Sequence, residues 1–223
     1  TAVETNFSLP QLFVSGNAPY RLLFRDEFVV FSPECFVRIS DNTIRSFPMK
    51  GTIDAGLPDA AAKLLNNPKE TAEHHTIVDL IRNDLSMVAE HVRVERFRYL
   101  EEIKTNQKHL LQASSEISGQ LAPGWEANIG SLLQTLLPAG SVSGAPKKRT
   151  IEIIREAEKS DRGYYTGVFG LFDGKNLDSA VMIRFIEQRS NGLFFRSGGG
   201  ITVNSDAESE YRELIDKVYV PAV

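Results

Sequence analysis

Short apolar runs over the first fifty positions predict a series of short strands. Turn-forming pairs such as Gly16-Asn17 and Asp41-Asn42 separate the runs. Closely spaced strands with such short connections are typical of antiparallel hairpins. The predicted strands are Gln11–Val14, Tyr20–Phe24, Glu27–Phe31, Cys35–Ile39 and Thr43–Phe47.

A helical pattern replaces these short runs after Thr52. Helices are predicted over residues 58–66 and 67–89, with Asn67 as the cap of the second and Pro68 in its first position. An extended segment, Val92–Tyr99, follows, whereas residues 107–119 alternate too weakly to be assigned.

The second half of the chain again groups its helices and strands in blocks. Helices are predicted over 128–137 and from Pro146 onward, and a capping box of Ser205 and Glu208 predicts the last one. Because the blocks do not alternate strictly, the fold class is α+β with a largely antiparallel sheet in one domain, residues 1–223. The predicted strands of this half are Tyr164–Asp173, Ser179–Glu187 and Gly192–Ser197, and Gly198–Gly200 then leads into Ile201–Val203 and the last helix.

Two of the predicted helices each place a pair of glutamates on one face. Glu70 and Glu73 are three residues apart, as are Glu210 and Glu213. Carboxylates that point inward must be paired, protonated or bound to a metal, and Mg2+ suits an oxygen-only set. Two simpler interpretations remain open: Glu70 completes a helix cap, and Glu213 forms an ordinary surface pair with Lys217.

The face that carries Glu70 and Glu73 continues into apolar positions. Ile77, Leu80 and Ile81 follow at helical spacing. This continuity favours carboxylates that face a cleft or the interior.

Two basic residues stand in apolar surroundings. Lys50 lies in PMKGT, where a strand is predicted to end, and an apolar pocket there would favour a neutral, nucleophilic amine. A surface lysine on a turn is the alternative. Alternation along AVMIRFIE places Arg184 on the same face as Met182 and Ile186, so Arg184 either faces inward toward a carboxylate or reaches solvent.

Two glycine-rich segments could expose backbone N–H groups to an anion. Ala139–Pro146 precedes a helix but lacks the spacing of a P-loop, and Gly198–Gly200 allows close backbone approach or simply a sharp bend. Together with the glutamates, Lys50 and Arg184, these segments predict a small polycarboxylate ligand bound through Mg2+ and cationic donors.

Composition limits the kinds of partner and the cellular compartment that fit this sequence. A net charge of −4 argues against a nucleic-acid partner, and no apolar run approaches the length of a membrane span. The single cysteine, Cys35, fits a reducing cytoplasm, where we expect the protein. Because the chain starts at Thr1 in strand-like sequence, we also expect N-terminal strands to be missing.

Six ordered motifs resemble the chorismate-utilising enzymes, from about Cys35 to the C-terminus. This family contains anthranilate synthase component I, isochorismate and salicylate synthases, and aminodeoxychorismate synthase component I. The resemblance implies an antiparallel β-sandwich wrapped by helices. The motifs are PMKGT, EHHTIVDLIRNDLSMVA, LLPAGSVSGAPKKRTIEII, RGYYTG, AVMIRF and SGGGITVNSDAESEYRELIDKV.

The resemblance also implies residue roles. Lys50 stands before Gly-Thr, as in the aminodeoxychorismate synthases, where this lysine attacks C2 of chorismate and ammonia then adds at C4. By the same resemblance Glu73 and Glu213 bind Mg2+ directly, Glu70 and Glu210 act on it through water, Arg184 and Tyr165 hold the enolpyruvyl carboxylate, and Thr52, Gly199, Gly200 and Lys217 contact the substrate.

Departures from the family pattern help to choose among its reactions. Gln112 replaces a histidine found in many members, which argues against pyruvate elimination, and Glu4 falls where isochorismate-forming members carry a base lysine. Ile53-Asp54-Ala55 stands where Arg-Gly often follows the Gly-Thr pair, so a supporting contact differs.

The leading interpretation is amination of chorismate to 4-amino-4-deoxychorismate on the route to p-aminobenzoate and folate. Its ammonia would be free ammonium or the product of a glutamine amidotransferase subunit. Two alternatives remain: anthranilate synthase component I, which would release pyruvate, and a chorismate-binding fragment without turnover.

Overall fold

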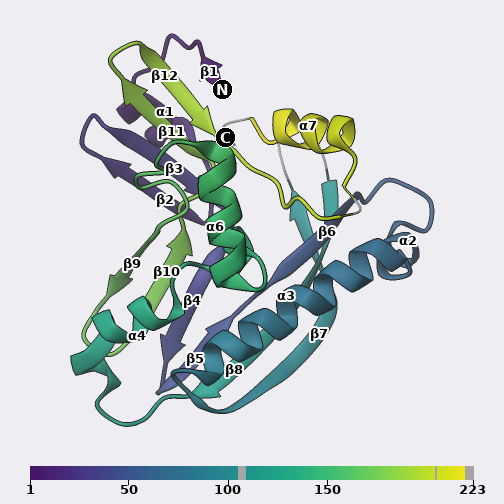
Figure 1. Ribbon diagram of the computed structural model, residues 1–223, viewed down its shortest axis with the longest axis vertical. Coiled ribbons are helices and arrows are strands. Elements are labelled where there is room, and N and C mark those ends of the chain that lie inside the picture. Colours follow the sequence, from purple (N-terminus) through teal and green to yellow (C-terminus); the bar gives the residue numbers. More distant parts are fainter. Residues whose placement is uncertain (105–108, 204, 219–223) are drawn as a thin grey trace. The chain divides into compact units, whose positions relative to one another are not determined.

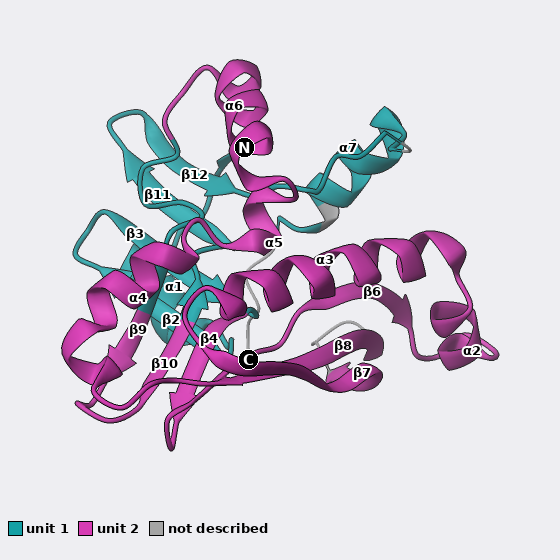
Figure 2. Cartoon of the chain, turned by 60° about the horizontal axis from the view of Figure 1, so that its bottom comes forward, with its two compact units in different colours: residues 1–34, 162–169, 180–223 teal, residues 35–161, 170–179 magenta. Residues whose placement is uncertain are grey.

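The computed structural model describes residues 1–104, 109–203 and 205–218 (Figure 1). The chain divides into two compact units (Figure 2). Unit 1 comprises residues 1–34, 162–169 and 180–223, and unit 2 comprises residues 35–161 and 170–179. The expectation of one domain over the whole chain stays a prediction.

Unit 1 is built on a five-stranded antiparallel sheet in the order β1-β12-β11-β3-β2. This sheet therefore combines strands from the N-terminal and C-terminal parts of the sequence. The elements are β1 (Ala2–Val3), α1 (Leu9–Ser15), β2 (Tyr20–Phe24), β3 (Phe28–Ser32), β11 (Phe185–Arg189), β12 (Gly192–Arg196) and α7 (Ala207–Asp216).

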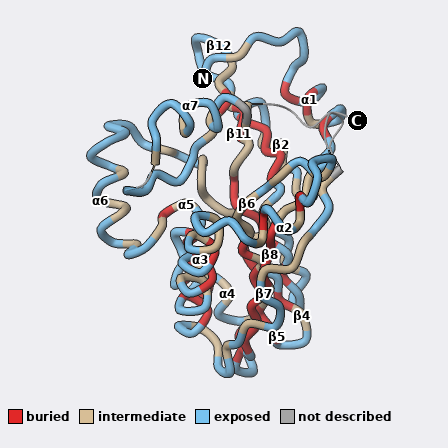
Figure 3. The backbone as a smooth tube through the Cα atoms, turned by 90° about the vertical axis from the view of Figure 1, so that its right-hand side faces the viewer, coloured by how far each residue is buried: buried red, intermediate tan, exposed pale blue. Residues whose placement is uncertain are grey.

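β3 is buried on both of its faces, so its sequence lacks polar alternation. Val29 and Phe31 pack with Leu9 and Leu12 of α1, and Phe28 packs in a second cluster with Phe185. The buried segments of α1 and β11 are red in Figure 3. This sheet and α1 form the hydrophobic core of unit 1.

Unit 2 contains most of a seven-stranded sheet in the order β6-β8-β5-β4-β10-β9, with β7 paired to β8. β9 (Val168–Phe172) and β10 (Leu177–Val181) carry residues of both units. The other strands are β4 (Cys35–Ser40), β5 (Thr43–Ser46), β6 (Met49–Asp54), β7 (Glu90–Lys104) and β8 (His109–Gln120).

Some helices of unit 2 pack directly against this sheet. α3 contacts β6, β7 and β8, and its first half carries the predicted glutamate pair. The helices are α2 (Ala60–Leu65), α3 (Pro68–Ser86), the short 3-10 helix η1 (Trp125–Asn128), α4 (Ile129–Leu136), α5 (Gly140–Ser143) and α6 (Lys147–Glu158).

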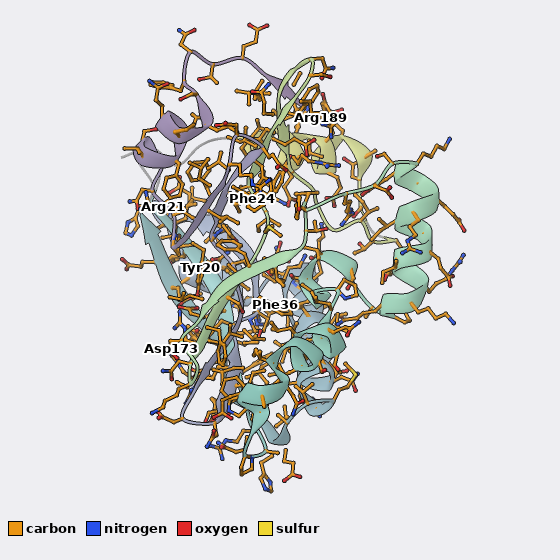
Figure 4. The ribbon with its side chains drawn as sticks, turned by 90° about the vertical axis from the view of Figure 1, so that its left-hand side faces the viewer. Tyr20, Arg21, Phe24, Phe36, Asp173 and Arg189 are labelled. Carbon is orange, nitrogen blue, oxygen red and sulfur yellow. The ribbon has the colours of Figure 1, made fainter. Side chains whose placement is uncertain are left out.

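The predicted α+β class and its antiparallel sheets are confirmed, but several elements differ. The predicted strand Gln11–Val14 is wrong, because this segment belongs to α1. Ser8 caps that helix in a capping box with Gln11, and Pro10 lies in its first turn. Arg21 of β2 donates a hydrogen bond to the carbonyl oxygen of Gly16 at the end of α1, over 2.6 Å (Figure 4).

The predicted strand Ser179–Glu187 is also wrong as one element. β10 ends at Val181 and β11 begins at Phe185, and Arg184 between them has a φ of +53°. Two hydrogen bonds flank this break: the Val181 amide donates to the Glu34 carbonyl, and the Phe31 amide of β3 donates to the Arg184 carbonyl.

One further boundary needs correction: β9 starts only at Val168, whereas the strand was predicted from Tyr164. Residues 109–119 of the unassigned stretch belong to β8, whereas 107 and 108 lie outside the described residues. Across the described ranges, no helix combines the length and apolarity needed to cross a membrane.

Candidate functional site

Lys50 projects from a β-bulge near the start of β6. Met49 pairs with Ser114 and Thr52 with Gln112, so three steps along β6 match two along β8. A strand does end just before this segment, as predicted, since β5 ends at Ser46, but a new strand, β6, begins at Met49 and contains Lys50. The lysine Nζ donates to Oε2 of Glu73 on α3 over 3.1 Å.

Gly51 makes this bulge possible and brings it close to α3. Its φ is +84°, a conformation that strains residues with a Cβ atom. A Cβ at this position would lie 2.9 Å from Oε2 of Glu70 and equally close to Cδ1 of Leu64. The structure thus brings Lys50, Glu70 and Glu73 together.

The start of α3 follows the prediction. The Asn67 side chain accepts hydrogen bonds from the Lys69 and Glu70 amides over 3.0 and 3.2 Å, and Pro68 occupies the first turn. This cap orients the first turn, which carries Glu70. Ile77 is buried, as the face pattern predicts.

His74 is a buried residue of the same helix that the sequence analysis missed. Its side chain is fully buried, and its Nε2 lies 2.7 Å from Oγ of Ser115 on β8. Burial, assisted by the charge of Arg98, lowers the pKa of His74 to about 4, so the ring is neutral at pH 7. The spacing of His74 to Ile77 and Val78, three and four residues, was a signal for the buried face.

The glycine-rich segment before α6 is a packing element in this structure. A Cβ on Gly140 would lie 3.0 Å from Leu80 and 3.1 Å from Ile81, so the glycine lets α5 approach α3 closely. Lys147 at the start of α6 donates to Oδ2 of Asp84 over 2.6 Å and to the Leu136 carbonyl over 2.9 Å. Close packing and the hydrogen bonds of Lys147 therefore explain the small residues and the position of this segment without a bound anion.

Thr52 contacts β8 beside the bulge. Its Oγ1 lies 3.4 Å from Nε2 of Gln112, the residue directly opposite it in the strand pairing. Gln112 therefore flanks one of the predicted substrate contacts.

In unit 1, Tyr165 is surrounded by aromatic and cationic groups. Its ring lies edge-on to Phe185, with centroids 6.0 Å apart, and the guanidinium groups of Arg162 and Arg196 lie 5.9 and 5.2 Å from its centroid. A Cβ on Gly198 would lie 3.1 Å from the tyrosine hydroxyl. Gly198 at the start of the glycine run thus lies beside the hydroxyl of Tyr165.

Arg184 does not follow the predicted alternation. It lies in the break between β10 and β11 and is half-buried there. The prediction that it shares a face with Met182 and Ile186 is wrong, because the positive φ interrupts the strand. Its role toward a carboxylate stays a prediction.

The last helix carries the second glutamate pair. Asp206, not Ser205, is the N-cap of α7, and its carboxylate accepts from the Ser209 amide over 3.0 Å. Ser205 instead donates its hydroxyl to Oε1 of Glu210 over 2.7 Å. Hydrogen bonding by Ser209 lowers the pKa of Asp206.

Lys217 joins this helix to the glycine run. Its Nζ donates to Glu213 over 2.5 Å and to the Gly198 carbonyl over 3.2 Å. A Cβ on Gly199 would lie 3.4 Å from Oε2 of Glu210. These predicted site residues therefore lie together in unit 1, whereas no contact for Gly200 points to its predicted role.

Each unit offers carboxylate oxygens, the donors that Mg2+ prefers. Glu70 and Glu73 project from successive turns of α3, and Glu210 and Glu213 do so from α7. Among the described residues, no group of three or more His, Cys, Asp or Glu side chains is gathered closely enough to hold an ion. The donor chemistry fits Mg2+, and the binding itself stays a proposal.

Comparison with known proteins decides the family. The model of the family described as chorismate binding enzyme matches residues 7–222. The chain belongs to this family. Membership of this family covers binding of chorismate and enzymatic activity but does not specify one reaction.

Individual relatives agree with this membership. The chain is 60% identical over 221 residues to a protein of Haemophilus influenzae named "Uncharacterized PabA-like protein", covering 99% of this chain and 67% of that protein. It is 37% identical to aminodeoxychorismate synthase component 1 of Escherichia coli, covering 93% of this chain and 47% of the relative.

A solved structure confirms the predicted fold type. Anthranilate synthase component I from Streptococcus pneumoniae superimposes with a TM-score of 0.76 at 32% identity, over 90% of this chain and 45% of that one. The chain thus spans about half the length of these two named enzymes.

Proposed function

We propose that the protein aminates chorismate to 4-amino-4-deoxychorismate, as the synthase component on the route to p-aminobenzoate and folate. The observation that carries the proposal is the position of Lys50. A glycine-dependent bulge aims this amine at Glu73, 3.1 Å away, beside Glu70. A lysine held in a built site is suited to nucleophilic catalysis, whereas a surface lysine on a turn is not.

In the proposed reaction the neutral Lys50 amine attacks C2 of chorismate, and the 4-hydroxyl leaves with a proton as water. Ammonia then adds at C4, and the bond from lysine to C2 breaks to regenerate the free amine. The sum consumes chorismate and ammonia and yields aminodeoxychorismate and water. Glu73, as the partner of Lys50, orients the amine before attack.

Mg2+ is the proposed cofactor. Glu73 and Glu213 are the proposed direct ligands, and Glu70 and Glu210 are proposed to act through bound water. When bound, the ion would neutralise the ring carboxylate of chorismate and fix its orientation.

The remaining site residues are proposed to hold the substrate. Arg184 and Tyr165 would bind the enolpyruvyl carboxylate. Further contacts are proposed for Thr52, Gly199, Gly200 and Lys217. Ammonia would come from free ammonium or from a glutamine amidotransferase subunit, and we propose that the reaction takes place in the cytoplasm.

Formation of anthranilate is the second candidate, because the structurally similar Streptococcus enzyme is an anthranilate synthase component I. This reaction releases pyruvate and does not use Lys50 as a nucleophile. The two reactions therefore differ in a product and in their dependence on one residue.

The test is incubation of the chain with chorismate, Mg2+ and ammonium, followed by mass spectrometry. Aminodeoxychorismate is expected, and it should fall by at least about a thousandfold in Lys50→Ala, since the covalent step is lost. Lys175→Ala is the matched control, because this exposed lysine lies in the turn before β10. If anthranilate and pyruvate form and persist in Lys50→Ala, the protein is an anthranilate-forming enzyme and the second candidate is correct. If the chain binds chorismate but forms no product, it is a chorismate-binding fragment without turnover.

A further inference from the structure

Arg98 of β7 binds the junction between α2 and α3. Its Nη1 donates to the carbonyl oxygen of Leu65 and to Oγ1 of Thr71, both over 2.8 Å, and its Nη2 donates to the carbonyl oxygen of Leu64 over 3.1 Å. Leu64 and Leu65 end α2, where carbonyl groups lack helical partners. Thr71 lies at the end of the first turn of α3. One guanidinium group therefore binds the end of one helix and the start of the next.

A second β-bulge directs the Arg98 side chain toward this junction. Between Arg96 and Tyr99, three steps along β7 match two along β8. Arg98 lies in this bulge with a φ of +47°, a backbone conformation that is unfavourable for a residue with a Cβ atom. Such a conformation persists only where the surrounding contacts hold it, and it is common at functional sites.

The two bulges flank the same part of β8. The Lys50 bulge lies along one edge of that strand, in β6, and the Arg98 bulge lies along the other edge, in β7. Ser115 of β8 contacts both segments: its amide donates to the Pro48 carbonyl over 2.9 Å, and its Oγ accepts from the Arg98 amide over 3.0 Å. One residue of β8 thus joins the two irregular segments.

The α2–α3 junction forms one side of the Lys50 site. Cδ1 of Leu64, in the last turn of α2, lies 2.9 Å from the position of a Cβ on Gly51. Oε2 of Glu70, in the first turn of α3, is equally close to that position. Movement of either helix end would therefore change the space around the bulge that carries Lys50.

Thr71 connects Arg98 to the cap of α3. Its hydroxyl donates to the Asn67 carbonyl over 2.7 Å and accepts from the Arg98 guanidinium. The Asn67 side chain in turn accepts from the Glu70 amide over 3.2 Å. Arg98 and Glu70 are therefore linked through two hydrogen-bonded residues at the start of the helix.

We propose that Arg98 is a positioning residue for the Lys50 site: it fixes the α2–α3 junction so that both helix ends stay against the Lys50 bulge. This inference rests on the proposed role of Lys50. Arg98 acts through the junction and not on the substrate. The planar guanidinium group presents several donors at once to acceptors on two helices, whereas the ammonium group of a lysine is a single point of charge.

Arg98→Met removes the guanidinium donors and keeps an apolar side chain. We expect kcat for aminodeoxychorismate formation to fall by about 10- to 100-fold at an unchanged KM for chorismate, as a displaced reacting group causes. Arg93→Met is the matched control on the same strand, because Arg93 is exposed and paired with Glu95, and its kcat should stay within about twofold of wild type. An unchanged kcat in folded Arg98→Met, or an equal loss in the control, would overturn the proposal.

Variants of Thr71 test the contact from its other side. Thr71→Val keeps the shape of the side chain and loses the oxygen that Arg98 binds, so kcat should fall by about three- to tenfold. Thr71→Ser, which keeps this oxygen, should match wild type. A wild-type kcat in Thr71→Val would overturn the proposal even if Arg98→Met does not fold.

The double variant shows whether the two residues act through one contact. Because Arg98→Met already removes the hydrogen bond to Thr71, Arg98→Met/Thr71→Val should be no slower than Arg98→Met alone. A double variant slowed by the product of the two single effects would overturn the proposal.

A measurement without turnover separates this inference from the proposed function. The amide resonance of Gly51 should shift in Arg98→Met and in Thr71→Val but not in Arg93→Met, because only the first two release the junction. An unshifted Gly51 resonance in the folded variants would overturn the inference. If Lys50→Ala retains activity, the proposed function fails, while the Gly51 resonance still reports whether Arg98 holds the junction.

Discussion

The two units carry similar groups in different structural contexts. Each has a helix with two glutamates three residues apart, and a glycine faces the first glutamate of each pair. Each second glutamate binds a lysine. In α7 this lysine is Lys217, four residues along the same helix, whereas Glu73 of α3 binds Lys50, which is 23 residues away on β6.

The Lys217–Glu213 pair is local to one helix, whereas the Lys50–Glu73 pair depends on tertiary structure. An i,i+4 pair forms wherever the helix forms and contributes only a few tenths of a kcal/mol. The Lys50–Glu73 pair requires β6, its bulge and α3 to be in place together. It therefore reports on a built site, which is why the proposed chemistry is assigned to Lys50 and not to Lys217.

The largest expected difference between the two units comes from replacing one glycine in each unit with alanine. Gly51→Ala should destabilise unit 2 by about 1–3 kcal/mol, because it combines a positive φ with a Cβ only 2.9 Å from Glu70 and Leu64. Gly199→Ala should leave the free energy of unfolding near wild type, since its Cβ would lie at an ordinary 3.4 Å from Glu210. Urea unfolding measures both effects.

Gly174→Ala is the control for backbone strain alone. Gly174 has a φ of +95° and no atom within 4 Å of its Cβ position. Gly174→Ala should lower the free energy of unfolding by about 1–2 kcal/mol. If Gly51→Ala costs no more than Gly174→Ala, the close approach of β6 to α3 has no energetic role.

A smaller effect is expected on the reactivity of the two lysines. Glu73→Gln removes the carboxylate that binds the Lys50 amine, so acylation of Lys50 should accelerate by up to about fivefold. Glu213→Gln should accelerate acylation of Lys217 and leave Lys50 unchanged. Competitive labelling and peptide mass spectrometry measure both rates against Lys175. A faster Lys50 in Glu213→Gln would show that the two lysines are not independent.

Much of the fold could be predicted because its signals are local. Asn67 and Pro68 mark the start of α3, and short apolar runs separated by turns mark β2 to β5. Two predictions were wrong where the sequence carried a second signal or where the backbone changes direction. Ser8 and Gln11 form a capping box that starts α1, and the positive φ of Arg184 interrupts the predicted strand.

The sequence proposes the residue types of the candidate site but not their geometry. The glutamates and Lys50 were proposed from spacing and from the family resemblance. The direction of Lys50 depends on a bulge that exists only in the pairing with β8. His74 was missed although its spacing to Ile77 and Val78 marks the buried face, and its contact with Ser115, 41 residues away on β8, depends on tertiary structure.

The smallest expected difference concerns the caps of the two helices. Asn67 caps α3 with a neutral amide, and Asp206 caps α7 with a carboxylate whose pKa is lowered by its hydrogen bonds to Ser209. A group whose pKa is lower in the folded state stabilises it above the unfolded value of 3.8, and this contribution is lost as pH falls through the folded pKa. Acidification below pH 3.8 should thus shift the Ser209 amide resonance, whereas the Lys69 amide, which donates to the neutral Asn67 side chain, should change little. In Asp206→Asn the Ser209 shift should no longer depend on pH, because an amide does not titrate in this range. Equal acid sensitivity of the two amides in the wild-type chain would contradict the distinction between the caps.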